Sequence, residues 1–168
     1  MLHGRVHQIN VSPGGVPKFP VDSAAITAAG ISGDGHNDTK HHGGPDAAVC
    51  LFSLEVIGLI RDEGHPIGAG TTGENVTLAG LDWTCVRPGC RFVFEGGVEL
   101  EVTRYTSPCA TIRDSFRGLE LRRIQQDLHP GQSRVYARVL REGRLRNGEG
   151  VSFVESPDIT AAVDAAPP

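Results

Sequence analysis

Cys109 is the residue of this sequence whose surroundings point most directly to chemistry. It follows Ser107 and Pro108, and an amphipathic pattern begins directly after it. Because proline disfavours the helical conformation at the residue before it, we expect a helix to begin at Cys109. Unpaired N–H groups at the start of a helix stabilise a thiolate, and Arg104 and Arg113 can add positive charge. The sequence therefore predicts a reactive thiolate, against the alternative of a small buried core residue.

A second group of polar side chains lies in segment 33–46, which is rich in glycine, histidine and aspartate. Glycines let backbone N–H groups converge on an anion, and Lys40 with the imidazoles of His36, His41 and His42 adds charge or hydrogen bonds. The segment therefore predicts a phosphate-bearing ligand. Zinc is less favoured, because the side chains of adjacent residues such as His41 and His42 diverge. A solvated turn is the alternative.

Cationic side chains outside that segment give further candidates. Lys18 and Lys40 are the two lysines, against fourteen arginines, and Lys18 also lies in a glycine- and proline-rich segment that can bend round a ligand. Arg134 and Arg138 lie on a predicted strand and can point into a pocket. The alternative for both arginines is a solvated surface.

The segment 70–75 leads into another predicted strand. It contains two glycines followed by Glu74 and Asn75. These two side chains can orient a ligand or cap the turn.

Length and charge exclude several classes of function. The 168 residues fit one domain, and a formal net charge of −4 argues against binding to the nucleic-acid backbone. The longest apolar stretch, 51–60, is interrupted by polar residues and falls short of the roughly 20 residues that span a bilayer. The N-terminus lacks the apolar region of a secretory leader, so we expect a cytoplasmic protein.

The cysteine count argues against a disulfide scaffold and an iron–sulfur cluster. Four cysteines are too few to staple a chain of this length. Cys85 and Cys90 have the spacing C-x4-C, but the further ligand pair that a cluster needs is missing.

The elements that must position these residues are mainly strands. Alternating apolar residues predict a hairpin of 91–95 with 98–103, joined by a tight primed turn. A second hairpin is predicted between 134–141 and 150–155, with further strands at 4–11, 47–52 and 74–78. Six or seven short strands need to hide their edges. We therefore expect a mainly β fold, a closed or nearly closed antiparallel β-barrel with a few short helices.

Two segments carry helical periodicity. Residues 53–63 place Val56, Ile57 and Ile60 on one face, with Ser53 as N-cap. The stretch after Cys109 has near-helical apolar spacing, which Gly118 breaks into two short helices. Its apolar residues are Ile112, Phe116, Leu119, Ile124 and Leu128. Residues 156–168 are rich in alanine and proline, so the domain is expected to cover 1–155 and be followed by a flexible tail.

Taken in order along the chain, these segments resemble the MOSC domain, a family named after the C-terminal domain of molybdenum cofactor sulfurase. The resemblance covers residues 4–155, and within the family the chain is similar to the stand-alone bacterial branch. It is carried by segments 11–18, 33–34 and 38–46, by Gly73-Glu74-Asn75 and by Ser107-Pro108-Cys109. It implies a barrel-like fold and a cysteine that either ligates the molybdenum of a molybdopterin cofactor or carries sulfur as a persulfide.

The resemblance also implies roles for the other candidates. The phosphate-binding role would belong to Lys18, Lys40 and Arg138. The residues expected near the pterin or the substrate are His36, His41, His42, Glu74 and Asn75. Of these, His41, His42 and Glu74 could also deliver protons.

Three functions remain open from the sequence. The first is a molybdenum-dependent reductase of small N-hydroxylated substrates that needs a separate electron-donor reductase, since the sequence shows no flavin or iron–sulfur motif. The second is a sulfur carrier, in which Cys109 accepts sulfur from a cysteine desulfurase for the assembly of metal–sulfur centres. The third is a small-anion binding module with a structural cysteine.

Overall fold

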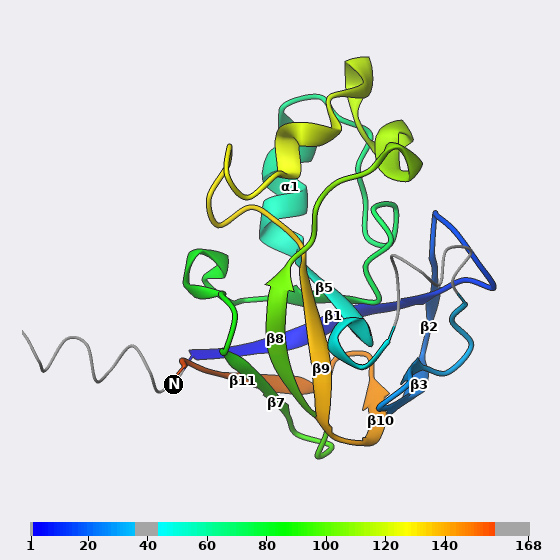
Figure 1. Ribbon diagram of the computed structural model, residues 1–168, viewed down its shortest axis with the longest axis vertical. Coiled ribbons are helices and arrows are strands. Elements are labelled where there is room, and N and C mark those ends of the chain that lie inside the picture. Colours follow the sequence, from blue (N-terminus) through cyan, green and yellow to red (C-terminus); the bar gives the residue numbers. More distant parts are fainter. Residues whose placement is uncertain (1, 36–43, 157–168) are drawn as a thin grey trace, which may run out of the picture.

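The main feature of the computed structural model, which describes residues 2–35 and 44–156, is a closed ring of seven strands. They pair in the order β11-β7-β8-β9-β5-β6-β1, and an additional pairing between β11 and β1 closes the ring (Figure 1). The strands are β1 (Leu2–Val11), β5 (Val49–Ser53), β6 (Val76–Ala79), β7 (Arg91–Phe94), β8 (Glu99–Tyr105), β9 (Val135–Arg141) and β11 (Gly150–Val154). The predicted mainly β barrel is confirmed.

Four shorter strands lie outside the ring. Strand β2 (Phe19–Val21) pairs with β1, and β10 (Gly143–Arg146), β3 (Ser23–Thr27) and β4 (Gly30–Ile31) form a separate three-stranded sheet. The described residues thus contain more strands than the six or seven predicted. Two of the four, β2 and β4, have only three and two residues, which is too short to show an alternating pattern in the sequence.

The first predicted hairpin is confirmed, with a different turn. Strands β7 and β8 are antiparallel and pair Val93 with Glu99. The N–H of Gly97 donates to the carbonyl of Phe94 at 3.0 Å, and Gly97 has a φ of 100°. This geometry belongs to a three-residue connection with one left-handed residue, in place of the tight primed turn.

The second predicted hairpin is wrong, although both of its strands exist. Strand β9 pairs with β5 and β8, whereas β11 pairs with β1 and β7. Between them the chain leaves the barrel to form β10 in the other sheet. The ring also contains one parallel pair, β5 with β6, so the barrel is not wholly antiparallel.

The predicted helix after β5 is confirmed as α1 (Leu54–Asp62), which packs against β5 and β6. The side chain of Ser53 accepts a hydrogen bond from the N–H of Val56 and so caps the helix. Val56, Ile57 and Ile60 are buried as expected. No helix among the described residues has the length and apolar character needed to cross a membrane.

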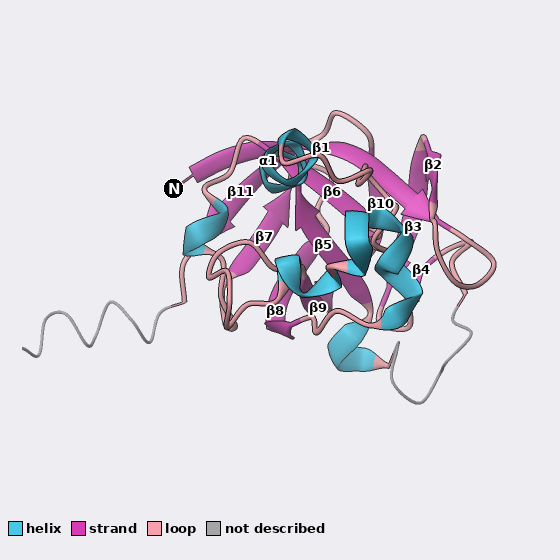
Figure 2. Ribbon diagram, turned by 90° about the horizontal axis from the view of Figure 1, so that it is seen from above, coloured by secondary structure: helices cyan, strands magenta, loops and turns pink. Residues whose placement is uncertain are grey.

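The predicted helices after Cys109 are instead short 3-10 segments: η3 (Ala110–Ser115), η4 (Arg117–Leu119) and η5 (Leu121–Ile124). The left-handed φ of 67° at Gly118 breaks them, as expected. Leu119 and Leu128 are exposed, so the apolar pattern is only partly buried. Two further 3-10 segments are η1 (Pro45–Ala47) and η2 (Trp83–Cys85). Figure 2 shows the helical segments lying over the strands when the molecule is seen from above.

Candidate functional site

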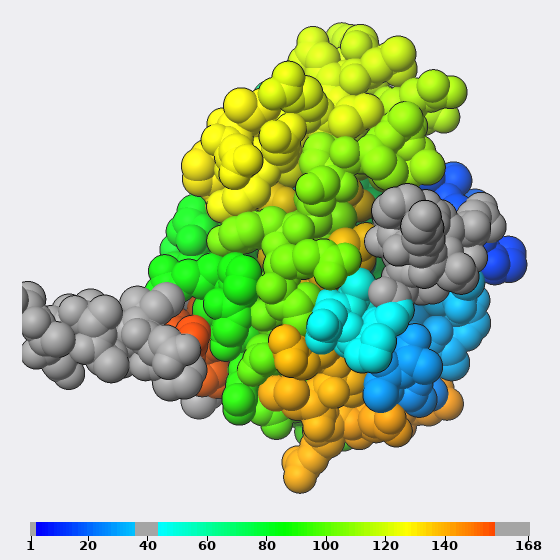
Figure 3. Space-filling model, viewed as in Figure 1, coloured from blue at the N-terminus to red at the C-terminus, as the bar shows by residue number. Residues whose placement is uncertain are grey.

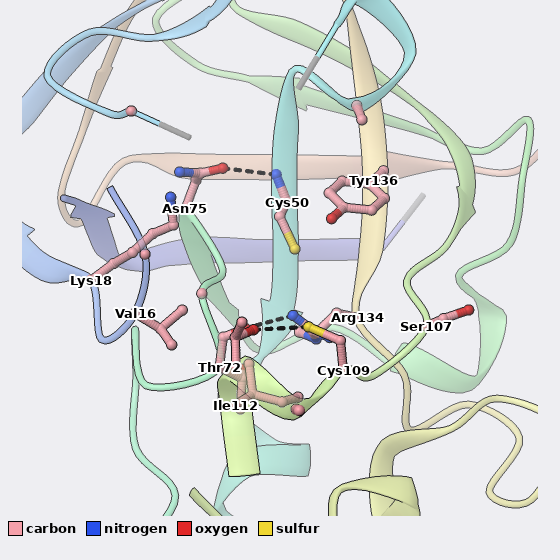
Figure 4. A pocket seen from close by; sticks show the side chains of 16 residues that line it. Val16, Lys18, Cys50, Thr72, Asn75, Ser107, Cys109, Ile112, Arg134 and Tyr136 are labelled. Atoms are coloured by element: carbon pink, nitrogen blue, oxygen red, sulfur yellow. Dashed lines mark hydrogen bonds between the residues drawn. The ribbon is translucent and has the colours of Figure 1, made fainter. Parts of the chain in front are cut away.

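A cavity of about 440 Å³ lies against the outer face of strands β5 and β9. Its walls come from segments 15–18, 72–75 and 107–112 and from single residues of the two strands (Figure 4). In Figure 3 this face is hollowed between the segment around residues 105–112 and the cyan segment that includes η1. The segments brought together here are those in which the sequence placed its candidates.

Cys50 on β5 and Tyr136 on β9 form the strand wall of the cavity. They are register partners in the antiparallel pair and make a small buried cluster separate from the barrel core. Their neighbours Val49, Leu51 and Val135 belong to the barrel core. Because side chains alternate across a strand, Cys50 and Tyr136 point to the opposite face.

Both groups keep their protons at neutral pH. Burial raises the pKa of the Cys50 thiol above its ordinary value and raises the pKa of Tyr136 to about 12. The guanidinium of Arg104 lies over the Tyr136 ring at 4.9 Å. Neither residue is among the site candidates predicted from the sequence. The available signal was the alternation along the strand, which places Cys50 on the face opposite to Val49 and Leu51.

Cys109 lies on the opposite wall, at the N-cap of η3. Its backbone is extended and its side chain is half-buried, with Sγ 2.8 Å from Oγ1 of Thr111. The prediction that a helical segment begins at Cys109 is confirmed. This segment has only six residues, so its dipole would stabilise a thiolate less than the longer helix that the sequence predicts. Arg113 is exposed on the same segment.

Lys18 enters the cavity as half of a buried ion pair. Its Nζ donates to both carboxylate oxygens of Asp34 at 2.6 Å, and the two side chains are 8% and 3% exposed. The carboxylate of Asp34 also accepts from the backbone N–H of Ser12 and from Nδ2 of Asn75. The sequence singled out Lys18 and Asn75, but the structure adds Asp34 as the group that holds both.

Asn75 and Glu74 are adjacent in the chain and have different roles. Asn75 lines the cavity, and its Oδ1 accepts from the N–H of Cys50 at 3.0 Å. Glu74 is fully buried, and its carboxylate accepts from the N–H of Gly70 and the hydroxyl of Thr72. Because these two donors belong to its own loop, Glu74 braces the loop. It is not among the residues that line the cavity.

The two arginines of the predicted strand also separate. Arg134 is 5% exposed, lines the cavity, and donates from Nη1 to the carbonyl of Thr72. Arg138 is exposed and forms long ion pairs with Asp46 and Glu101 at 3.7 and 3.5 Å, so it lies outside the cavity wall. Of the two, Arg134 is therefore the one placed to touch a ligand.

The remaining predicted site residues lie outside the described residues: His36, Lys40, His41 and His42. The parts of the chain that flank them in sequence reach the cavity, since Gly35 and Ala47 both line it. Within 2–35 and 44–156, no group of three histidine, cysteine or acidic side chains is placed to hold a metal ion. A metal bound at Cys109 would therefore need further ligands from outside residues 2–35 and 44–156.

Comparison with known proteins gives a family match over most of the chain. The family model described as "MOSC domain" matches residues 38–152. The uncharacterized protein YflK of Bacillus subtilis (strain 168) is 32% identical over 143 residues, which cover 83% of this chain and 63% of YflK. A protein named "Reductase" of Gibberella moniliformis is 27% identical over 135 residues, covering 78% of this chain and 24% of that protein.

A solved structure has the same fold. The crystal structure of YiiM from Geobacillus stearothermophilus aligns with a TM-score of 0.68 and 27% identity, covering 90% of this chain and 75% of that one. The chain spans less than two thirds of the length of both curated relatives named above.

Proposed function

Because the chain belongs to the MOSC domain family, we propose that its cavity holds a molybdenum–molybdopterin cofactor, with Cys109 as metal ligand, and reduces N-hydroxylated substrates. The observation that carries this proposal is the half-buried thiol of Cys109 on a cavity that also contains the cations Lys18 and Arg134. The relative named as a reductase supports a redox reaction.

The residues around the cavity fit such a cofactor. A volume of about 440 Å³ lies within the roughly 300–1,000 Å³ typical of small-molecule and cofactor sites. The thiolate of Cys109 is a soft metal ligand. Lys18 uses two of its three N–H groups on Asp34, which leaves one for a phosphate. A Cβ at Gly73 would come within 2.8 Å of Val16, so glycine keeps this wall open.

The reaction needs protons and electrons as well as a metal. Bound molybdenum would supply the chemistry that removes oxygen from an N–OH group. The overall change consumes two electrons and two protons and releases water, and the electrons come from a separate reductase. Tyr136 keeps the proton on its Oη, because burial raises its pKa to about 12, so it can orient a ligand by donating a hydrogen bond in the cavity. His41 and His42 stay predictions for the delivery of protons.

The test compares the wild type with Cys109→Ala, both purified from cells that make the cofactor. We expect molybdenum and pterin in the wild type, and N-hydroxy reductase activity once an electron-donor reductase is added. Cys109→Ala should lose the activity and most of the molybdenum. The matched control is Cys85→Ala, a partly exposed cysteine away from the cavity, which should keep both. A wild type without molybdenum would refute the proposal.

A sulfur carrier is the second candidate, because the half-buried Cys109 thiol lies on a cavity large enough to admit a donor's persulfide. The sulfane sulfur of a cysteine desulfurase would pass to the Cys109 thiolate, releasing the desulfurase thiol. Mass spectrometry after incubation with the desulfurase and free cysteine should then show one added sulfur on Cys109. An unmodified Cys109 would dismiss this function.

A further inference from the structure

Arg134 is a buried cation in the cavity wall whose hydrogen bonds are incomplete. It is 5% exposed, and Nη1 donates to the carbonyl of Thr72. Its Nε is buried and has no hydrogen-bond partner. Leaving a charged donor unpaired in a protein interior is costly, so the position calls for an acceptor that the described residues do not supply.

Comparison with other arginines shows that this state is specific to the cavity. Buried nitrogens of Arg87 and Arg123 are also unpaired, but each of these side chains forms an ion pair, with Glu155 and Glu63 respectively. No such pair with a carboxylate is found for Arg134 among residues 2–35 and 44–156. Within the described parts of the chain, its charge therefore has no ion-pair partner.

The other cation of the cavity is already neutralised. Lys18 is held by both oxygens of Asp34, so its positive charge is cancelled where it enters the cavity. In Figure 4, Lys18 and Asn75 occupy one part of the cavity, while Arg134 is drawn near Cys109. Arg134 and Cys109 both also act on the pKa of Tyr136. Of the two cations that the described residues place in the cavity, Arg134 is thus the one without a carboxylate partner, and it lines the same cavity as the Cys109 thiol.

The geometry points to Arg134 as a subsite for a carboxylate on the molecule that reacts at Cys109. One unpaired cation matches a monoanion, and a guanidinium donates to a carboxylate with strong directional hydrogen bonds. That the occupant is the substrate rests on the proposed function, and the substrate would then carry a carboxylate. A phosphate offers the same oxyanion chemistry, and the experiment separates the two.

Alkylation of Cys109 tests the subsite without any cofactor. Iodoacetate and iodoacetamide have nearly the same size and differ by a carboxylate against an amide. In both, the thiolate sulfur bonds to the methylene carbon and iodide leaves. Full-length protein is made in cells that lack the molybdenum cofactor, and peptide mass spectrometry separates Cys109 from the other three cysteines.

We expect the iodoacetate-to-iodoacetamide rate ratio at Cys109 to exceed that of 2-mercaptoethanol by about tenfold, because a charge-assisted hydrogen bond is worth about that factor. Arg134→Gln should remove this excess, and the ratio cancels any change that affects the rates of both reagents equally. The matched control is Arg138→Gln, four residues along the chain and exposed, which should behave as the wild type. A wild-type ratio equal to that of mercaptoethanol, or a ratio unchanged in a folded Arg134→Gln, would overturn the inference.

A second measurement uses the wild type alone and asks whether an added anion protects Cys109 from alkylation. Benzoate should slow the iodoacetamide labelling of Cys109, and benzamide at the same concentration should not. If inorganic phosphate protects and benzoate does not, the carboxylate assignment is wrong. Because the protein carries no cofactor in this experiment, failure here leaves the molybdenum measurement untouched, and absence of molybdenum leaves the labelling ratio untouched.

Discussion

Three donors meet the buried carboxylate of Glu74. The N–H of Gly70 and the hydroxyl of Thr77 donate to Oε1, and the hydroxyl of Thr72 donates to Oε2. Burial nevertheless raises the pKa of Glu74, so the cost of removing the carboxylate from water exceeds what the hydrogen bonds return to its charged form. The loop that forms one wall of the cavity is thus braced by a group that prefers to be protonated.

This preference predicts how stability depends on pH. Above the ordinary glutamate pKa of 4.5, the folded protein binds the Glu74 proton more tightly than the unfolded chain does. The free energy of unfolding therefore falls as pH rises from 4.5 through the raised pKa. Glu74→Gln lacks this component, so its stability relative to the wild type should increase with pH.

Urea unfolding at a series of pH values measures this difference. The control is Glu120→Gln, since Glu120 is exposed and its substitution should give a flat difference. A flat difference for Glu74→Gln as well would show that the carboxylate is accommodated in its charged form.

Residue types were more predictable than residue roles. The sequence selected both residues of the Glu74-Asn75 pair and both arginines of the predicted strand. Asn75 and Arg134 line the cavity, whereas Glu74 and Arg138 do not. Spacing along a strand restricts which face a side chain occupies, but not which part of that face a loop will cover. Asp34 shows the same limit, because its pairing with Lys18 depends on a contact between distant segments.

At the scale of elements, the loop 68–75 depends on a glycine with a left-handed backbone. Gly70 has a φ of 83°, and a Cβ there would collide with the carbonyl of Lys18. Gly148 lies outside this loop and serves as a comparison, because it has a similar φ of 80° but open space around it. The two positions therefore separate the cost of the left-handed conformation from the cost of the collision.

Alanine at Gly148 should lower the free energy of unfolding by about 1–2 kcal/mol, the cost of the conformation alone. Alanine at Gly70 should cost at least about 3 kcal/mol, because the loop must also move away from Lys18. Denaturant unfolding of the two variants gives both values. Equal losses would mean that the loop shifts freely and does not form a rigid wall of the cavity.

Local elements were predictable and distant pairings were not. Helix α1 and the β7–β8 hairpin were foreseen because cap, periodicity and turn lie within a few residues of one another. The predicted pairing of β9 with β11 is wrong, because pairing between distant strands is decided by closure of the ring. The segments after Cys109 have helical spacing, but the break at Gly118 leaves turns too short for an α-helix.

At the scale of the whole molecule, the first and last strands of the barrel join each other. Strand β11 pairs with β1 from Leu2 to Arg5 and with β7 on its other side. Val151 and Phe153 of β11 are buried, and the ring of Phe153 lies 5.6 Å from that of Phe92. A strand that closes a ring removes two exposed edges at once.

A chain that ends after residue 149 should therefore fail to fold cooperatively, since it loses buried apolar groups and leaves β1 and β7 without their partner. A chain that ends after residue 156 should unfold at the same midpoint as the full chain, if residues 157–168 are the tail that the sequence predicts. Thermal unfolding followed by circular dichroism compares the three chains. A cooperative transition in the shortest chain would show that the barrel does not need β11 to close, and a lower midpoint in the middle chain would place the end of the sequence within the domain.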